Sequence, residues 1–182
     1  MRVIAGEFGG RQLLAPKGWK VRPTPERVRE ALFSALGDVT GATVADLYCG
    51  TGALGIEAIS RGAGRAVLVD QDIRPAMGNV HNLGLLERVE LVRADSAAWV
   101  AGGAGGGSFD LVLLDPPYRQ ADTVAAALDP VIASVLAPGG RVVVESEAGR
   151  PLELPSLEVV RERRYGRSLV TFHVHSSSTE SR

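Results

Sequence analysis

The chain has 182 residues, of which 45% are hydrophobic, so it can form one domain around a packed core. Its single cysteine excludes an intramolecular disulfide framework and predicts a reducing compartment. The formal net charge of −1 argues against a protein that coats nucleic acid non-specifically. The sequence shows neither a secretory signal nor a long apolar stretch, so we expect a cytoplasmic protein without a membrane partner.

Charge is distributed unevenly along the chain. Residues 1–29 carry seven basic and two acidic side chains, whereas residues 38–140 carry six basic and twelve acidic ones. A basic arm on an acidic body is typical of a protein that meets phosphate groups locally. A solvated, charged N-terminus explains the same pattern equally well.

The N-terminal part predicts a hairpin followed by a helix. Within residues 2–14, the apolar pairs Val3-Ile4 and Leu13-Leu14 flank a glycine-rich turn. After an irregular, proline-rich segment, Thr24 is a suitable N-cap and Pro25 a suitable first helical residue. Apolar residues at helical spacing then predict a helix with one apolar face.

From residue 43 onward, short apolar runs alternate with helical patterns. Strands are expected at 43–48, 66–70, 89–92, 110–115 and 141–145, and helices at about 53–61, 73–83 and 121–136. Residues 157–163 and 168–174 predict a closing antiparallel hairpin, and the glycine cluster 102–107 predicts a flexible loop. This alternation indicates an α/β fold with a mainly parallel sheet and helices on both faces.

A glycine-rich loop follows the first predicted strand of this alternating region. Gly50, Gly52 and Gly55 match the G-x-G-x-x-G pattern of dinucleotide-binding proteins, and Asp70 stands twenty residues after Gly50, where it could take ribose hydroxyls. The glycines alone leave NAD binding open. Asp46, just before them, favours S-adenosyl-L-methionine, because a carboxylate suits a cationic ligand and sits badly beside a pyrophosphate.

Acidic residues end the first three strands of this region, at Asp46, Asp70 and Asp95. Such a series suits the amino-acid, ribose and adenine parts of S-adenosyl-L-methionine in turn. The alternative is that these carboxylates cap helices or turns.

The tetrapeptide Asp115-Pro116-Pro117-Tyr118 directly follows the most apolar predicted strand. Two prolines give the backbone a rigid extended turn, so the Asp115 carboxylate and the Pro116 carbonyl can both accept hydrogen bonds from one amino group. Tyr118 offers a flat face for stacking on a base. The alternative is a tight turn with a tyrosine in the core.

This arrangement addresses a chemical difficulty of the exocyclic amines of guanine, adenine and cytosine. Conjugation with the ring makes the nitrogen lone pair a poor nucleophile. Two fixed acceptors favour a pyramidal nitrogen and aim its lone pair at a methyl donor, so catalysis is mostly positioning. A paired or stacked base must leave its stack to reach such a pocket.

Together these motifs resemble class I amino methyltransferases, and more narrowly the RsmD family, which methylates guanine N2 in bacterial 16S ribosomal RNA. The resemblance extends from Arg2 to about Val174. The most specific part is the N-terminal hairpin with the segment Arg22-Pro-Thr-Pro-Glu-Arg-Val-Arg-Glu-Ala-Leu-Phe33. The motifs at 46–58 and 115–118 occur in many amino methyltransferases, so an adenine-N6 methyltransferase acting on DNA or RNA stays an alternative.

The resemblance implies a Rossmann-like, seven-stranded, mainly parallel sheet with a reversed last strand, plus a small N-terminal β-hairpin. It implies an RNA-contacting arm at 1–24, a catalytic domain at 25–175 and a disordered tail at 176–182. It also implies a 16S rRNA substrate in a partly assembled small subunit, and we expect a monomer.

The resemblance further implies roles for individual residues. The expected cofactor-binding residues are Asp46, Tyr48, Gly50, Gly52, Asp70, Gln71, Asp95, Ser96 and Asp115. The expected catalytic residues are Asp115, Pro116, Pro117 and Tyr118. The expected RNA-binding or site-organising residues are Arg2, Arg11, Arg22, Thr24, Arg27 and Arg29. Asp72 stays an alternative to Asp70 at the ribose, and no metal site is expected.

Overall fold

The computed structural model describes residues 1–15 and 24–175. Within these residues, seven strands form one mixed sheet in the order β3-β2-β1-β4-β5-β7-β6. β1 to β5 run parallel, and β7 runs antiparallel to both β5 and β6. The strands are β1 (Thr43–Leu47), β2 (Arg65–Asp70), β3 (Val89–Arg93), β4 (Phe109–Leu114), β5 (Leu136–Glu147), β6 (Leu157–Tyr165) and β7 (Ser168–His175). The predicted sheet with a reversed last strand is therefore confirmed.

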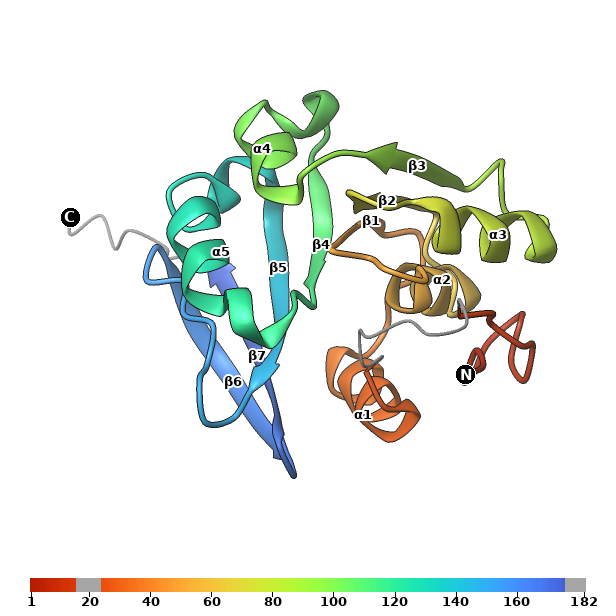
Figure 1. Ribbon diagram of the computed structural model, residues 1–182, viewed down its shortest axis with the longest axis horizontal. Helices are drawn as coiled ribbons and strands as arrows, with labels where there is room; N and C mark the ends of the chain where they lie inside the picture. The colour runs from red at the N-terminus through yellow and green to blue at the C-terminus, as the bar shows by residue number, and fades with distance from the viewer. Residues whose placement is uncertain (16–23, 176–182) are drawn as a thin grey trace.

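Five α-helices of the described residues cover the two faces of the sheet, as Figure 1 shows. α1 (Glu26–Leu36), α2 (Ala53–Ser60) and α3 (Arg74–Leu83) lie on one side, and α4 (Ser96–Ala101) and α5 (Ala121–Leu128) on the other. None of these helices is both long and apolar enough to cross a membrane.

Two apolar cores sandwich the sheet, because successive side chains of a strand point to opposite faces. In β4, Leu111 and Leu113 belong to the core shared with α1, α2 and α3. Val112 and Leu114 belong to the core shared with α4 and α5. All four side chains are at most 1% exposed, which explains why β4 is the most apolar strand of the sequence.

The structure corrects three expectations about the helices. α5 ends at Leu128 and does not continue to residue 136, because Pro130 cannot donate the next helical hydrogen bond. α4 was not predicted, since six residues are too few to show a helical period. α1 has Pro25 as its N-cap residue with no side-chain cap, so the expected cap by Thr24 is wrong.

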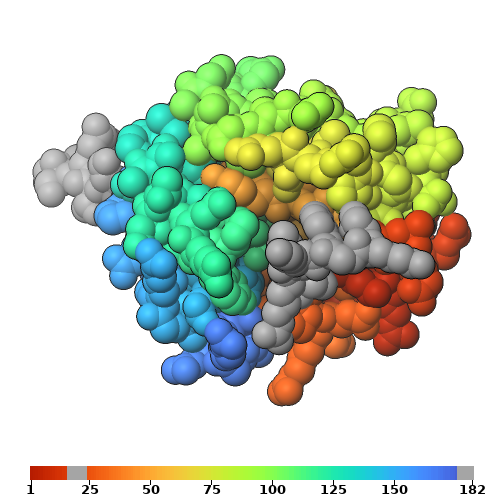
Figure 2. All heavy atoms as spheres, in the orientation of Figure 1, coloured from red at the N-terminus to blue at the C-terminus, as the bar shows by residue number. Residues whose placement is uncertain are grey.

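The N-terminal segment doubles back on itself as expected of a hairpin. The Val3 N–H donates to the Arg11 carbonyl at 2.9 Å, and the Leu13 N–H donates to the Met1 carbonyl at 2.9 Å. These bonds flank one antiparallel bridge, between Arg2 and Gln12. In Figure 2 this segment and the C-terminal strands lie on opposite sides of the face shown.

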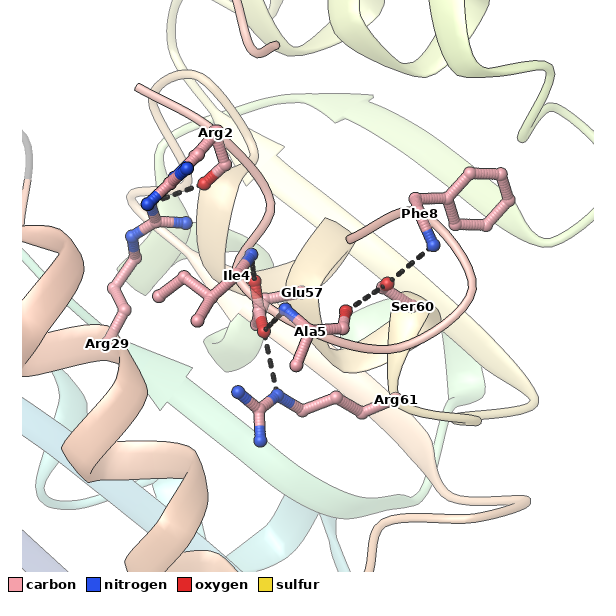
Figure 3. Close-up of polar contacts among 8 residues, drawn as sticks. All are labelled: Arg2, Ile4, Ala5, Phe8, Arg29, Glu57, Ser60 and Arg61. Carbon is pink, nitrogen blue, oxygen red and sulfur yellow. Dashed lines mark hydrogen bonds and ion pairs between the residues drawn. The ribbon is translucent and has the colours of Figure 1, made fainter. Parts of the chain in front are cut away.

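Hydrogen bonds fasten the N-terminal segment to α2. The Glu57 carboxylate accepts from the Ile4 N–H at 2.7 Å and from the Ala5 N–H at 3.1 Å. The Ser60 hydroxyl accepts from the Phe8 N–H at 2.9 Å and donates to the Ala5 carbonyl (Figure 3). A single face of α2 therefore satisfies the backbone of a segment that has little regular structure of its own.

Candidate active site

The strand register brings the predicted site residues to one edge of the sheet. Leu47, the last residue of β1, pairs with Val69 of β2 and with Leu114 of β4. Asp70 and Asp115 each follow one of these paired residues, so they stand at the carboxyl edge beside the glycine loop. Open α/β sheets bind their ligands at this edge.

The loop between β1 and α2 has an unusual backbone. Gly50 and Gly52 have φ angles of 55° and 76°, and Tyr48 has a φ of 59° although it carries a side chain. Such a conformation in a non-glycine residue is costly and often marks a functional site. Gly55 serves packing instead: a Cβ there would lie 2.2 Å from Leu68 Cδ2, so only glycine lets α2 approach β2 this closely.

Asp46 lies beneath this loop and is only 1% exposed. Its Oδ2 accepts a hydrogen bond from the Gly55 N–H at 2.8 Å, while its Oδ1 has no partner among the described residues. Burial raises the pKa of Asp46 to about 7. A buried carboxylate oxygen without a partner fits a cationic ligand group, such as the ammonium of S-adenosylmethionine, and does not fit a pyrophosphate.

Asp70 and Asp72 differ in their surroundings. The Asp70 carboxylate accepts from the Gly50 N–H at 2.9 Å and from the Asp72 N–H at 3.0 Å, so it organises the glycine loop. Asp72 pairs with Arg74 at 2.7 Å, and this hydrogen-bonded ion pair lowers the pKa of Asp72 to about 2. Asp70 is the better candidate for the ribose, because no cation of residues 1–15 or 24–175 forms an ion pair with it.

Asp95 and Ser96 begin α4 and act on the backbone. Asp95 caps the helix by accepting from the Ala98 N–H at 2.9 Å, and it also accepts from the Gln71 amide at 2.9 Å. This arrangement supports the capping alternative, so an adenine contact by Asp95 stays a prediction. The Ser96 hydroxyl accepts from the Tyr48 N–H at 3.1 Å and thereby helps to hold the strained loop.

Two adjoining cavities open at this edge, and Tyr48 and Asp115 line both of them. The larger has a volume of about 210 Å³ and is lined by Tyr48, Gly50, Asp70, Gln71, Asp72, Ser96, Asp115, Pro117 and Gln120. The smaller, of about 40 Å³, is lined by Thr24, Arg29, Asp46, Tyr48, Cys49, Thr51, Ala53, Leu54 and Asp115. The structure thus brings most of the expected cofactor and catalytic residues together, whereas Gly52, Asp95, Pro116 and Tyr118 do not line these cavities.

Asp115 is held by a residue far away in the sequence. The Thr24 hydroxyl donates to Asp115 Oδ2 and so does not cap α1. Burial, together with the negative charge of Glu145, raises the pKa of Asp115 well above its usual range. Asp115 therefore binds a proton more tightly than an exposed aspartate does.

Tyr118 points its hydroxyl toward the C-terminal strands. The hydroxyl donates to Glu145 Oε1 at 2.8 Å and lies 3.3 Å from Ser168 Oγ. Burial raises the pKa of Tyr118 to about 12. Glu145, only 2% exposed, was not predicted as a site residue. Its position at the end of an apolar run, like Asp46, Asp70 and Asp115, was the signal in the sequence.

The arginines expected to meet RNA fall into three groups. Arg2, Arg11 and Arg27 are exposed, and Arg2 pairs with Glu26 at 3.1 Å. Arg22 lies outside the described residues. Arg29 is fully buried, which favours the site-organising alternative over a contact with RNA.

A seven-stranded sheet with β7 reversed, and an acidic glycine loop at its carboxyl edge, define a class I methyltransferase. The family described as "Conserved hypothetical protein 95" matches residues 1–174. The chain belongs to this family, which confirms the resemblance to the RsmD family.

Individual relatives support this assignment. The chain is 34% identical over 175 residues to the "Putative rRNA methyltransferase YlbH" of Bacillus subtilis, covering 91% of this chain and 94% of that one. It is 36% identical over 123 residues to the "Ribosomal RNA small subunit methyltransferase D" of Escherichia coli K12, covering 66% of this chain and 61% of that one. The solved "Putative methyltransferase yhhF" of Escherichia coli superposes with a TM-score of 0.80 at 28% identity, covering 95% of this chain and 96% of that one.

Proposed function

We propose that the protein transfers a methyl group from S-adenosyl-L-methionine to the exocyclic N2 amine of a guanine in 16S ribosomal RNA. The observation that carries this proposal is the position of Asp115, which lines both cavities beside the glycine loop. Asp115, the expected acceptor for an amine, therefore also lines the pocket that would hold the methyl donor. Two relatives support the substrate by their names, one as a putative rRNA methyltransferase and the other as a ribosomal RNA small subunit methyltransferase.

The cofactor would be held by residues that the structure already orients. Asp46 would face its ammonium group, Asp70 its ribose, and the backbone at Gly50 would allow close approach. Tyr48, Gln71 and Ser96 would line its site. Gly52 and Asp95 would act through the loop and through Gln71, respectively. When bound, S-adenosylmethionine supplies an electrophilic methyl group.

Asp115 then orients the nucleophile. The amine of an extruded guanine donates one N–H to the Asp115 carboxylate and the other to the Pro116 carbonyl, which leaves its lone pair directed at the methyl donor. As the new C–N bond forms, the bond between the methyl group and the donor's sulfur would break and leave S-adenosylhomocysteine. The nitrogen, now acidic, would pass its proton to Asp115. The raised pKa makes the ionised Asp115 carboxylate a stronger base toward this proton than an exposed aspartate would be. Tyr118 supports the base from one side.

The basic N-terminal arm, residues 1–24, supplies the remaining contacts with RNA. Arg2 and Arg11 of this arm, together with Arg27 in the first turn of α1, expose cationic side chains, which suit phosphate oxygens. The catalytic domain, residues 25–175, provides the pocket. The substrate we propose is 16S rRNA within a partly assembled small subunit, bound by one copy of the chain.

The test is the methylation of 16S rRNA in cells that lack this protein. Mass spectrometry should show the loss of one N2-methylguanine, which the wild-type gene restores and Asp115→Ala does not. Asp115→Ala should lower transfer at least about 100-fold, as loss of a transition-state acceptor does, while S-adenosylhomocysteine still binds. Asp129→Ala, which removes an aspartate that lines neither cavity, is the matched control.

Other outcomes would point elsewhere. Unchanged 16S rRNA together with transfer to adenine in DNA would favour an adenine-N6 methyltransferase, because the tetrapeptide at 115–118 suits any planar amine. Full restoration of N2-methylguanine by Asp115→Ala would mean that the transfer does not need Asp115, as expected of an RNA-binding module that assists another enzyme. Either result contradicts the proposal.

A further inference from the structure

The smaller cavity holds two buried groups of opposite charge. Arg29 and Asp46 both line it, and they are 0% and 1% exposed. Its volume of about 40 Å³ exceeds the roughly 10–15 Å³ that one water molecule needs. It therefore has room for a small polar group about three times the size of a water molecule.

Arg29 comes from α1 and uses only part of its hydrogen-bonding capacity. Its Nη2 donates to the Arg2 carbonyl at 2.7 Å (Figure 3). Its Nε and Nη1 have no partner in the part of the chain that the structure describes. A buried guanidinium with unused N–H groups is costly, and therefore suggests a missing anionic partner.

Glu57 is the acidic residue that contributes most to the electrostatic environment of Arg29, but its oxygens are engaged elsewhere. They accept from the Ile4 and Ala5 N–H groups and from Arg61 Nε at 2.7 Å. No carboxylate of residues 1–15 or 24–175 pairs with Arg29 within 4.0 Å. Glu57 therefore moderates the charge of Arg29 from a distance and leaves its free N–H groups available.

Asp46 presents the complementary need on the same cavity. Its unpartnered Oδ1 accepts nothing from the described residues, so it suits a donor carried by a ligand. A cation and an anion that each lack a partner, on one small cavity, match a zwitterion. In an α-amino acid, the ammonium and the carboxylate are both attached to the same carbon atom.

We infer that Arg29 binds the carboxylate of the amino-acid end of S-adenosylmethionine, opposite the contact between Asp46 and its ammonium group. The inference rests on the proposed function. The planar guanidinium offers parallel N–H groups that match a carboxylate, which an ammonium side chain does not. Arg29 thereby becomes a specificity-determining residue that selects a ligand with an intact α-amino acid.

The experiment compares two ligands that differ in one group. S-adenosylhomocysteine and its decarboxylated analogue, S-adenosyl-3-thiopropylamine, are titrated by calorimetry into wild type, Arg29→Gln, Arg29→Lys and Arg61→Gln. Arg61→Gln is the matched control, because it removes the other cation beside Glu57 without lining the cavity. Thermal melts of each variant establish that it is folded.

Wild type should bind S-adenosylhomocysteine about 10- to 100-fold more tightly than the analogue, as expected of a charge-assisted hydrogen bond. Arg29→Gln should abolish this preference by weakening only the carboxylate-bearing ligand. Arg29→Lys should keep part of the preference, and Arg61→Gln all of it.

Three results would overturn the inference: equal affinity of wild type for the two ligands, a parallel loss of both ligands in Arg29→Gln, or an intact preference in that variant. If Arg29→Gln does not fold, the ratio of the two affinities in Arg29→Lys, compared with that in wild type, carries the test: an unchanged ratio overturns the inference. Failure of wild type to bind either ligand is a distinct result. It would remove the proposed cofactor itself, and the role of Arg29 with it.

Discussion

The polar side chains at the site are held in positions that cost stability. Asp46 is buried with one oxygen unpartnered, and Tyr48 keeps a positive φ. Each feature is unfavourable by itself, since burial penalises a carboxylate and a side chain crowds the left-handed backbone region. Asp46 and Tyr48 both lie at the start of the same glycine loop. Such a concentration of strain is typical of a site whose ligand relieves it.

The pKa of Asp46 predicts a pH dependence of cofactor binding. In the free protein this carboxyl titrates at about 7, so it is largely protonated and neutral at pH 6. An ammonium group binds the charged form, and binding must then expel the proton. Affinity for S-adenosylhomocysteine should fall by about tenfold per pH unit below pH 7, with release of about one proton per ligand at pH 6.

Calorimetry at pH 5.5–8, in buffers of different ionisation enthalpy, measures both quantities. Asp46→Asn should bind weakly and show a nearly flat profile over this range. An affinity in wild type that stays constant from pH 8 to pH 5.5 would argue against a contact between Asp46 and the ammonium group.

At the scale of elements, α2 has two separate tasks. Gly55, in its first turn, donates an N–H to Asp46 and allows close packing on β2. Glu57 and Ser60, in its second half, bind the backbone of the N-terminal segment. The helix thus connects the cofactor loop to the arm that we propose contacts RNA.

Gly6 provides a test of how the N-terminal segment is attached. A Cβ at Gly6 would lie 1.8 Å from the Ser60 carbonyl oxygen, whereas a Cβ at Gly10 would meet nothing within 4 Å. The φ angles are +81° and +83°, so both alanine variants incur a similar backbone cost of about 1–2 kcal/mol. Only Gly6→Ala should also detach the segment from α2.

Hydrogen exchange measures this detachment. The amides of residues 4, 5, 7 and 8 should exchange at least about tenfold faster in Gly6→Ala than in Gly10→Ala, because they lose their partners on α2. Similar exchange in the two variants would mean that the clash is absorbed without moving the segment.

At the scale of the whole molecule, the sheet order assembles a site from distant parts of the chain. Thr24 and Asp115 are hydrogen-bonded although they are 91 residues apart, and Tyr118 meets Ser168 across 50 residues. β4 occupies the centre of the sheet and carries Asp115 to the point where these segments converge. A ligand at this point contacts several elements simultaneously.

Binding should therefore stabilise the entire fold. S-adenosylhomocysteine at 100 times its dissociation constant adds about 2.7 kcal/mol to the free energy of unfolding, which raises the melting temperature by about 5–10 °C in a chain of this size. Differential scanning fluorimetry with NADH as the control ligand measures the shift. A rise with NADH and none with S-adenosylhomocysteine would contradict the cofactor assignment.

The order of strands and helices could be predicted from the sequence, because it depends on local apolar periodicity. The seven strands arise where such runs occur, and the glycine loop and the tetrapeptide at 115–118 stand at strand ends, as their composition indicated. Asp46 and Asp115 were identified for the same reason. A charged residue that ends an apolar strand is expected to lie at the edge of the sheet.

Only the tertiary structure decided what the remaining polar groups contact. Arg29 belongs to a basic stretch and suggested an RNA contact, but it lies on the inner face of α1 and is buried beside Asp46. Thr24 stands where a helix cap is expected, yet it donates to Asp115. Hydrogen bonds between segments far apart in the chain depend on how the elements pack, and no local pattern records that packing.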